Sequence, residues 1–368
     1  MSHRMMGGRK AEPAQSGFFS MLFDDIANAP VADPSSTSDW NDFFQTGAAI
    51  TAANVIGNEV TITCVPGQSH PIGSSSWQNF SHLIEFIDTD VFSSFGTNAF
   101  DNSSIEYFES GTLESFSFAM FSSCSNLLEA RADNLVTMDG RPLINTTVLE
   151  RAVYPNCIFL SENAFRLTSP NTNPLEISFP SLETTSIQCF QGRRGLTGVV
   201  NFPELTAIAQ EFLRDTRITI CNAPKATSIG SRSFFSVSTL LECNALLVES
   251  IGLSALEGTT NLSKCDYPNC VTVATRAFTN LANNNNLQVV NLPSCITISG
   301  GTTFNRRTGI ETLTLNSLET CGATTGDNNV FNQITGNTIE ITIPDTAIRD
   351  DGDIQYLVNN NTVTFIDP

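Results

Sequence analysis

The stretch TSIGSRSF at residues 227–234 holds one unit of the pattern that decides the fold. Its last residue, Phe234, belongs to a column of aromatic residues that recurs every 21 to 27 positions. The column consists of Phe100, Phe121, Phe165, Phe190, Phe212, Phe234, Phe278, Phe304 and Phe331, with Leu143 and Leu256 completing the spacing. A period of this length is typical of a repeat architecture, in which each unit is one small supersecondary element.

A second column runs in step with the first and is marked by proline. In LQVVNLP, residues 287–293, the proline follows an apolar residue, and another apolar residue lies two positions before that one. Prolines at the same point of the unit are Pro155, Pro180, Pro203, Pro224, Pro268, Pro293 and Pro344. Alternating apolar positions predict a short strand with one buried face, followed by a turn. Because so small a unit cannot bury its apolar face alone, the units must stack into a solenoid.

The expected fold class is therefore a repeat solenoid of strands and turns with little helix, whose parallel strands form one long β-sheet. The pieces LQVVNLP, TSIGSRSF and TRAF (residues 275–278) resemble the leucine-rich repeat named after Treponema and the Bacteroides surface antigen BspA. This resemblance covers roughly residues 83–344. It implies a leucine-rich repeat fold and a role in contact with host proteins or matrix.

The chain divides into four parts on this pattern. We expect an N-terminal arm at 1–50, an N-terminal cap region at 51–82, a solenoid of about 11 units at 83–338 and a C-terminal cap at 339–368. A cap is needed because an open solenoid end exposes core and unpaired strand edges. The expected apolar contacts of the C-terminal cap are Ile348, Ile354, Tyr356 and Leu357.

The N-terminal arm carries two aromatic clusters, FFSMLF at 18–23 and WNDFF at 40–44, separated by an acidic spacer rich in proline, alanine and serine. Short aromatic anchors on a polar spacer are typical of a segment that docks onto another protein. The alternative is that the arm folds back on the first repeat. The docking candidates are Phe18, Phe19, Leu22, Phe23, Trp40, Phe43 and Phe44.

Charge is distributed unevenly along the 368 residues. The chain has 18 basic and 37 acidic residues, and no lysine or arginine occurs between residues 11 and 130. Phosphate-backbone binding needs clustered cations, so the composition disfavours a nucleic-acid partner. A protein or glycan receptor remains the expected partner.

The start of the chain, MSHRMMGGRK, is basic but is not followed by the apolar run of a signal peptide. No apolar stretch reaches the length of a membrane-spanning helix. We therefore expect neither a signal peptide nor a membrane span, and a location in a virion or in the cytoplasm.

Ten cysteines raise the question of disulfides or metal binding. Cys221, Cys243 and Cys265 lie 22 residues apart at one strand position, where neighbouring units have valine, isoleucine or leucine. This pattern predicts free thiols packed in the core, because cysteine behaves there as a small hydrophobe. With no CxxC spacing, we expect no metal and no cofactor, and reduced thiols weakly indicate synthesis in a reducing compartment.

Catalytic motifs are missing from the sequence. It contains neither GxSxG nor HExxH nor a phosphate-binding loop, and only three histidines. Carboxylate pairs such as Asp88 with Asp90 are interpreted as solvated turn residues. We therefore expect no enzymatic activity.

The strand position that faces away from the core is the expected ligand surface, because solenoids bind partners there. The candidates are Asn201, Asn222, Asn244, Asp266, Asn291 and Thr314. The alternative is a structural ladder in which the amides bond to one another along the sheet. Polar loops that lengthen a unit, at 166–174, 279–286 and 322–330, are either further binding loops or neutral insertions.

Two functions from different classes fit this pattern. The first is a recognition or adhesion protein that presents its solenoid to a receptor, for example as a phage or virus virion component anchored by the N-terminal arm. The alternative is an assembly protein whose solenoid packs into a larger complex without a receptor. Large exposed apolar patches would favour assembly, and a polar outer strip favours recognition.

Overall fold

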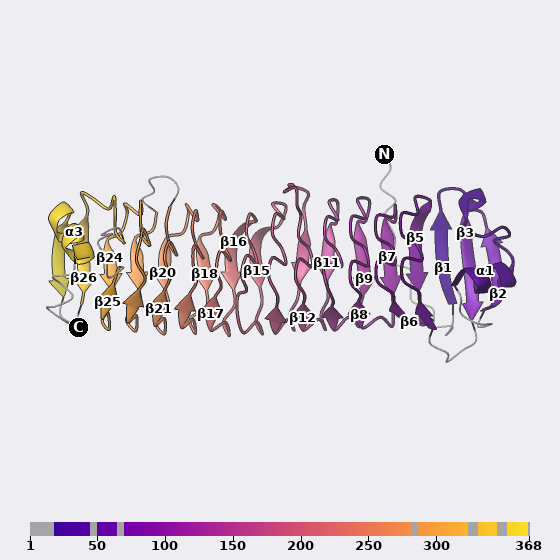
Figure 1. The fold of residues 1–368 in the computed structure, drawn as a ribbon, viewed down its shortest axis with the longest axis horizontal. Helices are drawn as coiled ribbons and strands as arrows, with labels where there is room; N and C mark the ends of the chain where they lie inside the picture. Colours follow the sequence, from indigo (N-terminus) through magenta and orange to yellow (C-terminus); the bar gives the residue numbers. More distant parts are fainter. Residues whose placement is uncertain are drawn as a thin grey trace.

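The computed structural model describes residues 18–44, 50–64, 70–280, 286–322, 330–343 and 352–366. These residues form one elongated solenoid, in which successive turns lie side by side along the long axis (Figure 1). Each repeat contributes a strand to one row and a shorter strand to a second row. The predicted solenoid of parallel strands with little helix is confirmed.

The first row carries the longer strands and their outward side chains. Its members are β5 (Leu83–Asp88), β7 (Tyr107–Ser110), β9 (Glu129–Ala132), β11 (Arg151–Val153), β13 (Glu176–Ser178), β15 (Thr197–Asn201), β16 (Arg217–Asn222), β18 (Glu242–Asn244), β20 (Lys264–Asp266), β22 (Val289–Asn291), β24 (Thr312–Thr314) and β26 (Thr338–Thr342). Within each of three sheets, β5 to β13, β15 to β18 and β20 to β26, neighbouring strands pair in parallel, so equivalent positions of successive repeats lie directly beside each other. Any residue type that recurs at one strand position therefore forms a continuous line across each sheet. The row is divided between β13 and β15 and between β18 and β20, instead of forming the one long sheet expected from the sequence.

The second row follows the proline-marked turns. Its members are β4 (His70–Ile72), β6 (Phe92–Phe95), β8 (Ser115–Phe116), β10 (Thr137–Met138), β12 (Phe159–Leu160), β14 (Thr184–Thr185), β17 (Ser228–Ile229), β19 (Ser250–Ile251), β21 (Thr272–Val273), β23 (Thr297–Ile298) and β25 (Thr320–Cys321). These strands also pair in parallel, with one buried residue each in most repeats. The buried side chains of the second row thus cover a second side of the solenoid core.

The aromatic column lies between the two rows and is buried throughout. Phe165 stacks on Phe190 with ring centroids 5.0 Å apart and planes at 6°, and Phe278 stacks on Phe304 in the same way. The turn that carries each ring bends through left-handed residues, as Arg232 and Ser236 do around Phe234 with φ of 55° and 61°. Such non-glycine conformations are unfavourable alone, so ring stacking and backbone pairing between repeats must hold them in place.

The N-terminal end of the solenoid is covered by a segment that contains both strands and helical turns. It consists of β1 (Phe18–Phe23), the 3-10 turn η1 (Ile26–Asn28), α1 (Thr37–Phe44), β2 (Ile50–Ile56) and β3 (Glu59–Cys64). Strand β1 lies between β3 and β5 and pairs antiparallel with both, while β2 and β3 form a hairpin at the end of the sheet (Figure 1). Residues 18–44 therefore continue the solenoid sheet and its core.

This arrangement corrects the interpretation of the N-terminal arm as a docking segment. Phe19 and Trp40 are fully buried, and Phe44 stacks on Trp40 with ring centroids 5.7 Å apart. Phe23 is also buried, Phe43 packs against the core, and Phe18 and Leu22 are half-buried. The physical reason is that the first repeat has no preceding neighbour, so its exposed core and the edge of β5 need a cover. Residues 1–17 and 45–49 of the arm lie outside the described residues.

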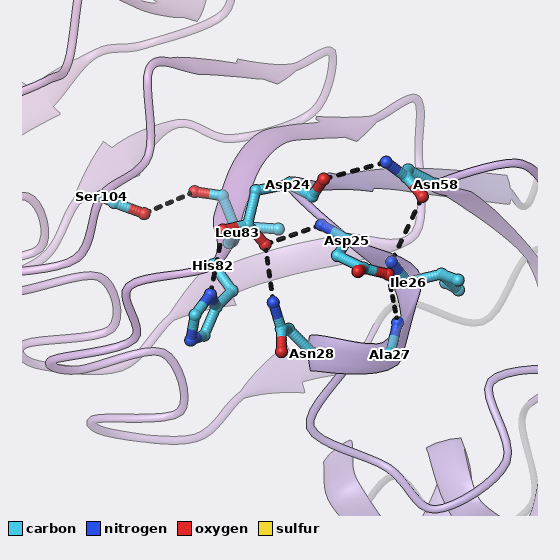
Figure 2. Close-up of polar contacts among 9 residues, drawn as sticks. All are labelled: Asp24, Asp25, Ile26, Ala27, Asn28, Asn58, His82, Leu83 and Ser104. Atoms are coloured by element: carbon cyan, nitrogen blue, oxygen red, sulfur yellow. Dashed lines mark hydrogen bonds and ion pairs between the residues drawn. The ribbon is translucent and has the colours of Figure 1, made fainter.

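A polar cluster fastens β1 to the first repeat (Figure 2). The Asp24 carboxylate lies 3.0 Å from Nδ1 of His82 and accepts a hydrogen bond from the Asn28 amide, and these contacts lower the pKa of Asp24. The Asn58 amide donates to the backbone oxygen of Asp24, and its own oxygen accepts from the Ile26 amide. The end of β1 is thus tied both to the β2–β3 hairpin and to the start of β5.

The C-terminal end has a helix and a final strand. They are α3 (Gly352–Asn360) and β27 (Thr362–Ile366), and β27 pairs in parallel with β26. Of the four apolar contacts expected there, Ile354 and Leu357 are buried, Tyr356 packs partly buried against the core, and Ile348 lies outside the described residues.

Candidate functional site

The six predicted ligand-surface residues lie at equivalent outward positions of the first row, three on the sheet of β15, β16 and β18 and three on the sheet that begins at β20. On the sheet of β15, β16 and β18, the Asn222 amide donates to Oδ1 of Asn201 at 2.7 Å, and the Asn244 amide donates to Oδ1 of Asn222 at 2.8 Å. Parallel pairing places these residues on adjacent strands in register. The amide ladder is therefore present, while its participation in ligand binding stays a prediction.

The equivalent positions continue on the sheet that begins at β20. The Asn291 amide donates to Oδ1 of Asp266 at 2.7 Å, and Lys264 Nζ lies 2.6 Å from the other carboxylate oxygen. Burial raises the pKa of Asp266, but the hydrogen bonds from Lys264 and Asn291 outweigh burial and hold it below its ordinary value. Thr314 follows Asn291 directly in register. These contacts fix the side chains before any ligand arrives.

The two halves of this outward face differ in character. Toward the N-terminal end, Arg151 pairs with Glu129 at 3.1 Å and lies 3.7 Å from Glu176. From β15 onward, asparagine and threonine dominate, and the apolar side chains Val199 and Leu241 are 52% and 43% exposed. A β-bulge at Gly198, where φ is 72°, turns Val199 outward. The C-terminal half therefore offers mainly uncharged polar side chains, with a few apolar contacts and with charged side chains at Glu242, Lys264, Asp266 and Glu340.

Two open hollows lie next to this surface, where the strands of the first row begin. The first has a volume of about 380 Å³ and is lined by Leu241, Asn261, Ser263, Asn286 and Gln288. The second has a volume of about 720 Å³ and is lined by Gln288, Thr308, Gly309, Glu311, Thr312, Gly336, Asn337, Thr338 and Glu340. Gln288 borders both hollows, and we call the two together the strand-start groove.

Of the three lengthened loops, only 166–174 is described throughout. The amides of Asn171 and Asn173 both donate to the backbone oxygen of Thr147, at 2.7 and 2.9 Å. Gly195 of the next repeat packs so closely that a Cβ there would lie 1.5 Å from the Asn173 oxygen. The loop is thus fastened to its neighbours on both sides. Residues 281–285 and 323–329 of the other two loops lie outside the described residues.

Sequence analysis missed two buried arginines. Arg193 is 2% exposed, and its guanidinium donates to the backbone oxygens of Phe165 at 2.5 Å, Thr146 at 2.6 Å and Leu143 at 3.3 Å, and also to Oγ1 of Thr146. It therefore reaches back across the two preceding repeats. Burial lowers its pKa to about 9, so the group is still charged at neutral pH.

Arg307 repeats this arrangement in the second half of the chain. It is fully buried and donates to the backbone oxygens of Phe278, Thr259 and Leu256, and to Oγ1 of Thr259. Leu143 and Leu256, the two departures from the aromatic column, are thus both contact residues of a buried arginine. The sequence signal is a near-duplication: YPNC occurs at both 154–157 and 267–270, an offset of 113 residues, and the two arginines, each three residues after a phenylalanine of the aromatic column, are 114 residues apart.

All ten cysteines are free and buried, which confirms the prediction that they pack in the core. Cys221 lies beside Cys243 in register, as its spacing indicated. Burial raises the pKa of Cys157, Cys270 and Cys295 to about 12. These thiols are therefore protonated at neutral pH, which makes them poor nucleophiles and poor metal ligands.

The acidic pair Asp88 and Asp90 differs from expectation. Asp88 is buried rather than solvated: it accepts hydrogen bonds from the Val91 amide at 2.9 Å and the Ser110 hydroxyl at 2.8 Å. Burial raises its pKa to about 6 despite these bonds. Within the described ranges, no group of three or more histidine, cysteine, aspartate or glutamate residues is arranged to hold a metal ion. Nor do those ranges contain a helix long and apolar enough to cross a membrane.

Comparison with known proteins finds one family. A model of the BspA type leucine rich repeat region matches this chain in 6 copies, over residues 58–172, 160–285 and 245–352. Among solved structures, a leucine-rich repeat protein from Bacteroides ovatus is similar, with 16% sequence identity, a TM-score of 0.45, and a match that covers 81% of this chain and 69% of that chain. No curated protein matches at a significant level.

Proposed function

Because the chain belongs to the family with BspA-type leucine-rich repeats, whose repeats point to protein interaction or adhesion, we propose that it is a non-enzymatic recognition protein. In this proposal a protein or glycan receptor contacts the outward side chains of the first row of strands, from β15 to β26. The first and second rows are called the first and second sheet below. The expected contact residues are Asn201, Asn222, Asn244, Asp266, Asn291 and Thr314.

The observation that carries this proposal is the pre-formed set of polar contacts on that face. The Asn201–Asn222–Asn244 ladder and the Asp266–Asn291 contact hold amide and carboxylate groups in fixed positions at the surface. A surface that is ordered before binding loses less conformational entropy when its partner arrives. Broad, fixed surfaces of this kind are what solenoids use for recognition.

A place in an assembled particle, such as a phage or virus virion, is part of the proposal. Buried thiols suit synthesis in a reducing compartment, and a particle component can still meet an external receptor. Since residues 18–44 cover the first repeat, we propose that surfaces other than these residues attach the protein to the particle. Leu246 and Leu247, which are 56% and 47% exposed in one turn, favour such packing and are also the observation behind the alternative of a purely structural assembly protein.

The test compares two double variants of the full chain as baits in native-source extracts. Asn244→Trp with Thr314→Trp places bulk on the outward face of the first sheet, and Thr272→Trp with Thr320→Trp places the same bulk on the second sheet. We expect the first pair to abolish capture of the receptor and the second pair to retain it. Equal retention by both variants would rule out the first sheet as the recognition face.

A further inference from the structure

We propose that the strand-start groove binds a neutral oligosaccharide. This inference rests on the proposed recognition function and names the ligand class that its surface takes. The groove runs along the starts of β18, β20, β22, β24 and β26, beside the predicted ligand surface. Four strand spacings separate the first and last of these strands, or about 19 Å, so the groove is long enough for several linked sugar rings.

The groove lining suits sugar hydroxyl groups. Its side chains are mainly amides and hydroxyls, and Asn261, Ser263 and Gln288 are all exposed along it. An amide both donates and accepts hydrogen bonds, and so does a sugar hydroxyl, so each can satisfy the other in several orientations. The Gln288 amide donates to Oε1 of Glu311 at 3.2 Å, which orients Gln288 beside the two hollows that it borders.

Charge decides which sugars the groove accepts. Among the residues that the structure describes, the charged ones that line the hollows are Glu311 and Glu340, and no lysine or arginine borders either hollow. Carboxylates accept strong hydrogen bonds from hydroxyl groups but repel sulfate and carboxylate substituents. The groove therefore favours neutral sugars over sulfated or sialylated ones.

One position of the groove lining, Gly336, leaves room for a ligand. Gly336 has a φ of 78°, and a Cβ built there would meet nothing within 4 Å. Leu241, at the opposite end, is 43% exposed and offers an apolar contact for the C–H face of a ring. Polar groups along the groove with an apolar contact at one end match the mixed surface of an oligosaccharide.

A peptide fits the groove less well. The strands β22 and β24 are paired on both sides and offer no edge for an added peptide strand. Strand β20 is the edge of its sheet, but the Ser263 amide there already donates to the Leu241 backbone oxygen of the preceding repeat at 3.5 Å. Tight peptide binding also relies on deep pockets for aromatic or arginine anchors, whereas both hollows are open and have Leu241 as their single large apolar side chain.

The experiment screens the full chain on an array of neutral, sulfated and sialylated oligosaccharides and measures Kd for the best neutral binder by calorimetry. Two groove variants are compared with the parent: Gln288→Ala removes a hydrogen-bonding amide, and Thr312→Trp fills the larger hollow. Thr272→Trp, on the second sheet, is the matched control. Far-UV circular dichroism and Tm show that each variant is folded.

We expect binding of neutral sugars that is insensitive to salt, weakened roughly tenfold or more by either groove variant, and changed less than about twofold by Thr272→Trp. Neutral-sugar binding that both groove variants leave intact would place the sugar elsewhere and overturn the groove assignment. Binding confined to sulfated or sialylated sugars would overturn it too.

The outcomes separate this inference from the proposed function. If no sugar binds but a protein receptor is captured and then lost with Asn244→Trp and Thr314→Trp, the recognition function stands and the oligosaccharide inference fails. If neither a sugar nor a receptor binds, the recognition function itself fails.

Discussion

At the residue scale, the two buried arginines connect repeats that are not neighbours in sequence. Arg193 and Arg307 each satisfy three backbone oxygens and one threonine hydroxyl in the two preceding repeats. Buried carbonyl groups without a hydrogen-bond donor are costly. Each guanidinium supplies donors to the backbone oxygens of the stacked turns, which the apolar aromatic column cannot provide. Each arginine lies in the repeat that follows a lengthened loop, 166–174 for Arg193 and 279–286 for Arg307.

Replacing Arg193 by methionine should destabilise the protein by about 3 kcal/mol or more, because three carbonyls and a hydroxyl lose their donor. The neighbouring Arg194 is the control, since it is exposed and lies 3.9 Å from Asp215. Arg194→Met should change stability by less than about 0.5 kcal/mol. Urea unfolding followed by circular dichroism measures both. Equal effects of the two variants would contradict a structural role for the buried guanidinium.

Asp88 makes stability depend on pH. Its pKa is about 6 in the folded protein against 3.8 as its ordinary value, because burial disfavours the carboxylate and Asp90 adds repulsion. A raised pKa means that its contribution to stability is fully present below pH 4 and is lost as the pH rises through 6. The loss amounts to up to about 3 kcal/mol.

Asp88→Asn should remove this pH dependence, since asparagine keeps an acceptor for the Val91 amide without the charge. We expect the variant to be more stable than the parent at pH 7.5, with the difference shrinking toward pH 4. Thermal unfolding across this range tests it. A variant that becomes less stable than the parent as the pH rises would contradict this account, because it would show that the carboxylate stabilises the fold in its charged form.

At the element scale, the N-terminal segment shows where sequence patterns are insufficient. Trp40 is fully buried, packs on Phe43 and Phe44, and donates through Nε1 to the Pro34 oxygen at 2.9 Å. Trp40→Ala should therefore cost about 3–5 kcal/mol. Asp42→Ala, on the exposed side of α1, is the control and should be neutral. If Trp40→Ala left Tm unchanged and abolished only partner binding, the docking interpretation would be restored.

The repeats were predictable because each repeat carries its own copy of the signal. The phenylalanine and proline columns and the strand alternation recur many times, so local departures such as Leu143 do not obscure them. The cover over the first repeat occurs once, and its antiparallel pairing of Phe19 with Ile62 and Asp88 joins distant segments. A short aromatic cluster has the same sequence pattern whether it docks on a partner or on its own chain.

The candidate site was predictable to a similar degree. The outward position of Asn222 and its neighbours follows from strand alternation, and their ladder follows from the parallel register. The strand-start groove could not be predicted from the sequence. Its lining residues come from variable positions before each strand, where no residue type recurs from repeat to repeat. The arginine sites were missed because a side chain that spans two repeats leaves no periodic signal, apart from the near-duplication in which the acceptor residues are offset by 113 positions and the arginines by 114.

At the scale of the whole molecule, different residues of the solenoid serve stability and the proposed recognition. The core is a single line of buried residues from Phe19 to Leu357, and the outward face adds nothing to it beyond its own ladder. Residues on that face can therefore change with little effect on folding. We propose that recognition is concentrated between β15 and β26, where asparagine and threonine dominate the outward positions.

The most direct test of that claim is hydroxyl-radical footprinting of the full chain, free and bound to its captured receptor. Val199 and Leu241 report on the first sheet, and Ile158 and Ile296, each 37% exposed, report on the second. We expect oxidation of Val199 and Leu241 to fall on binding while Ile158 and Ile296 are unchanged. Protection of Ile158 and Ile296 with Val199 and Leu241 still reactive would contradict recognition by the first sheet.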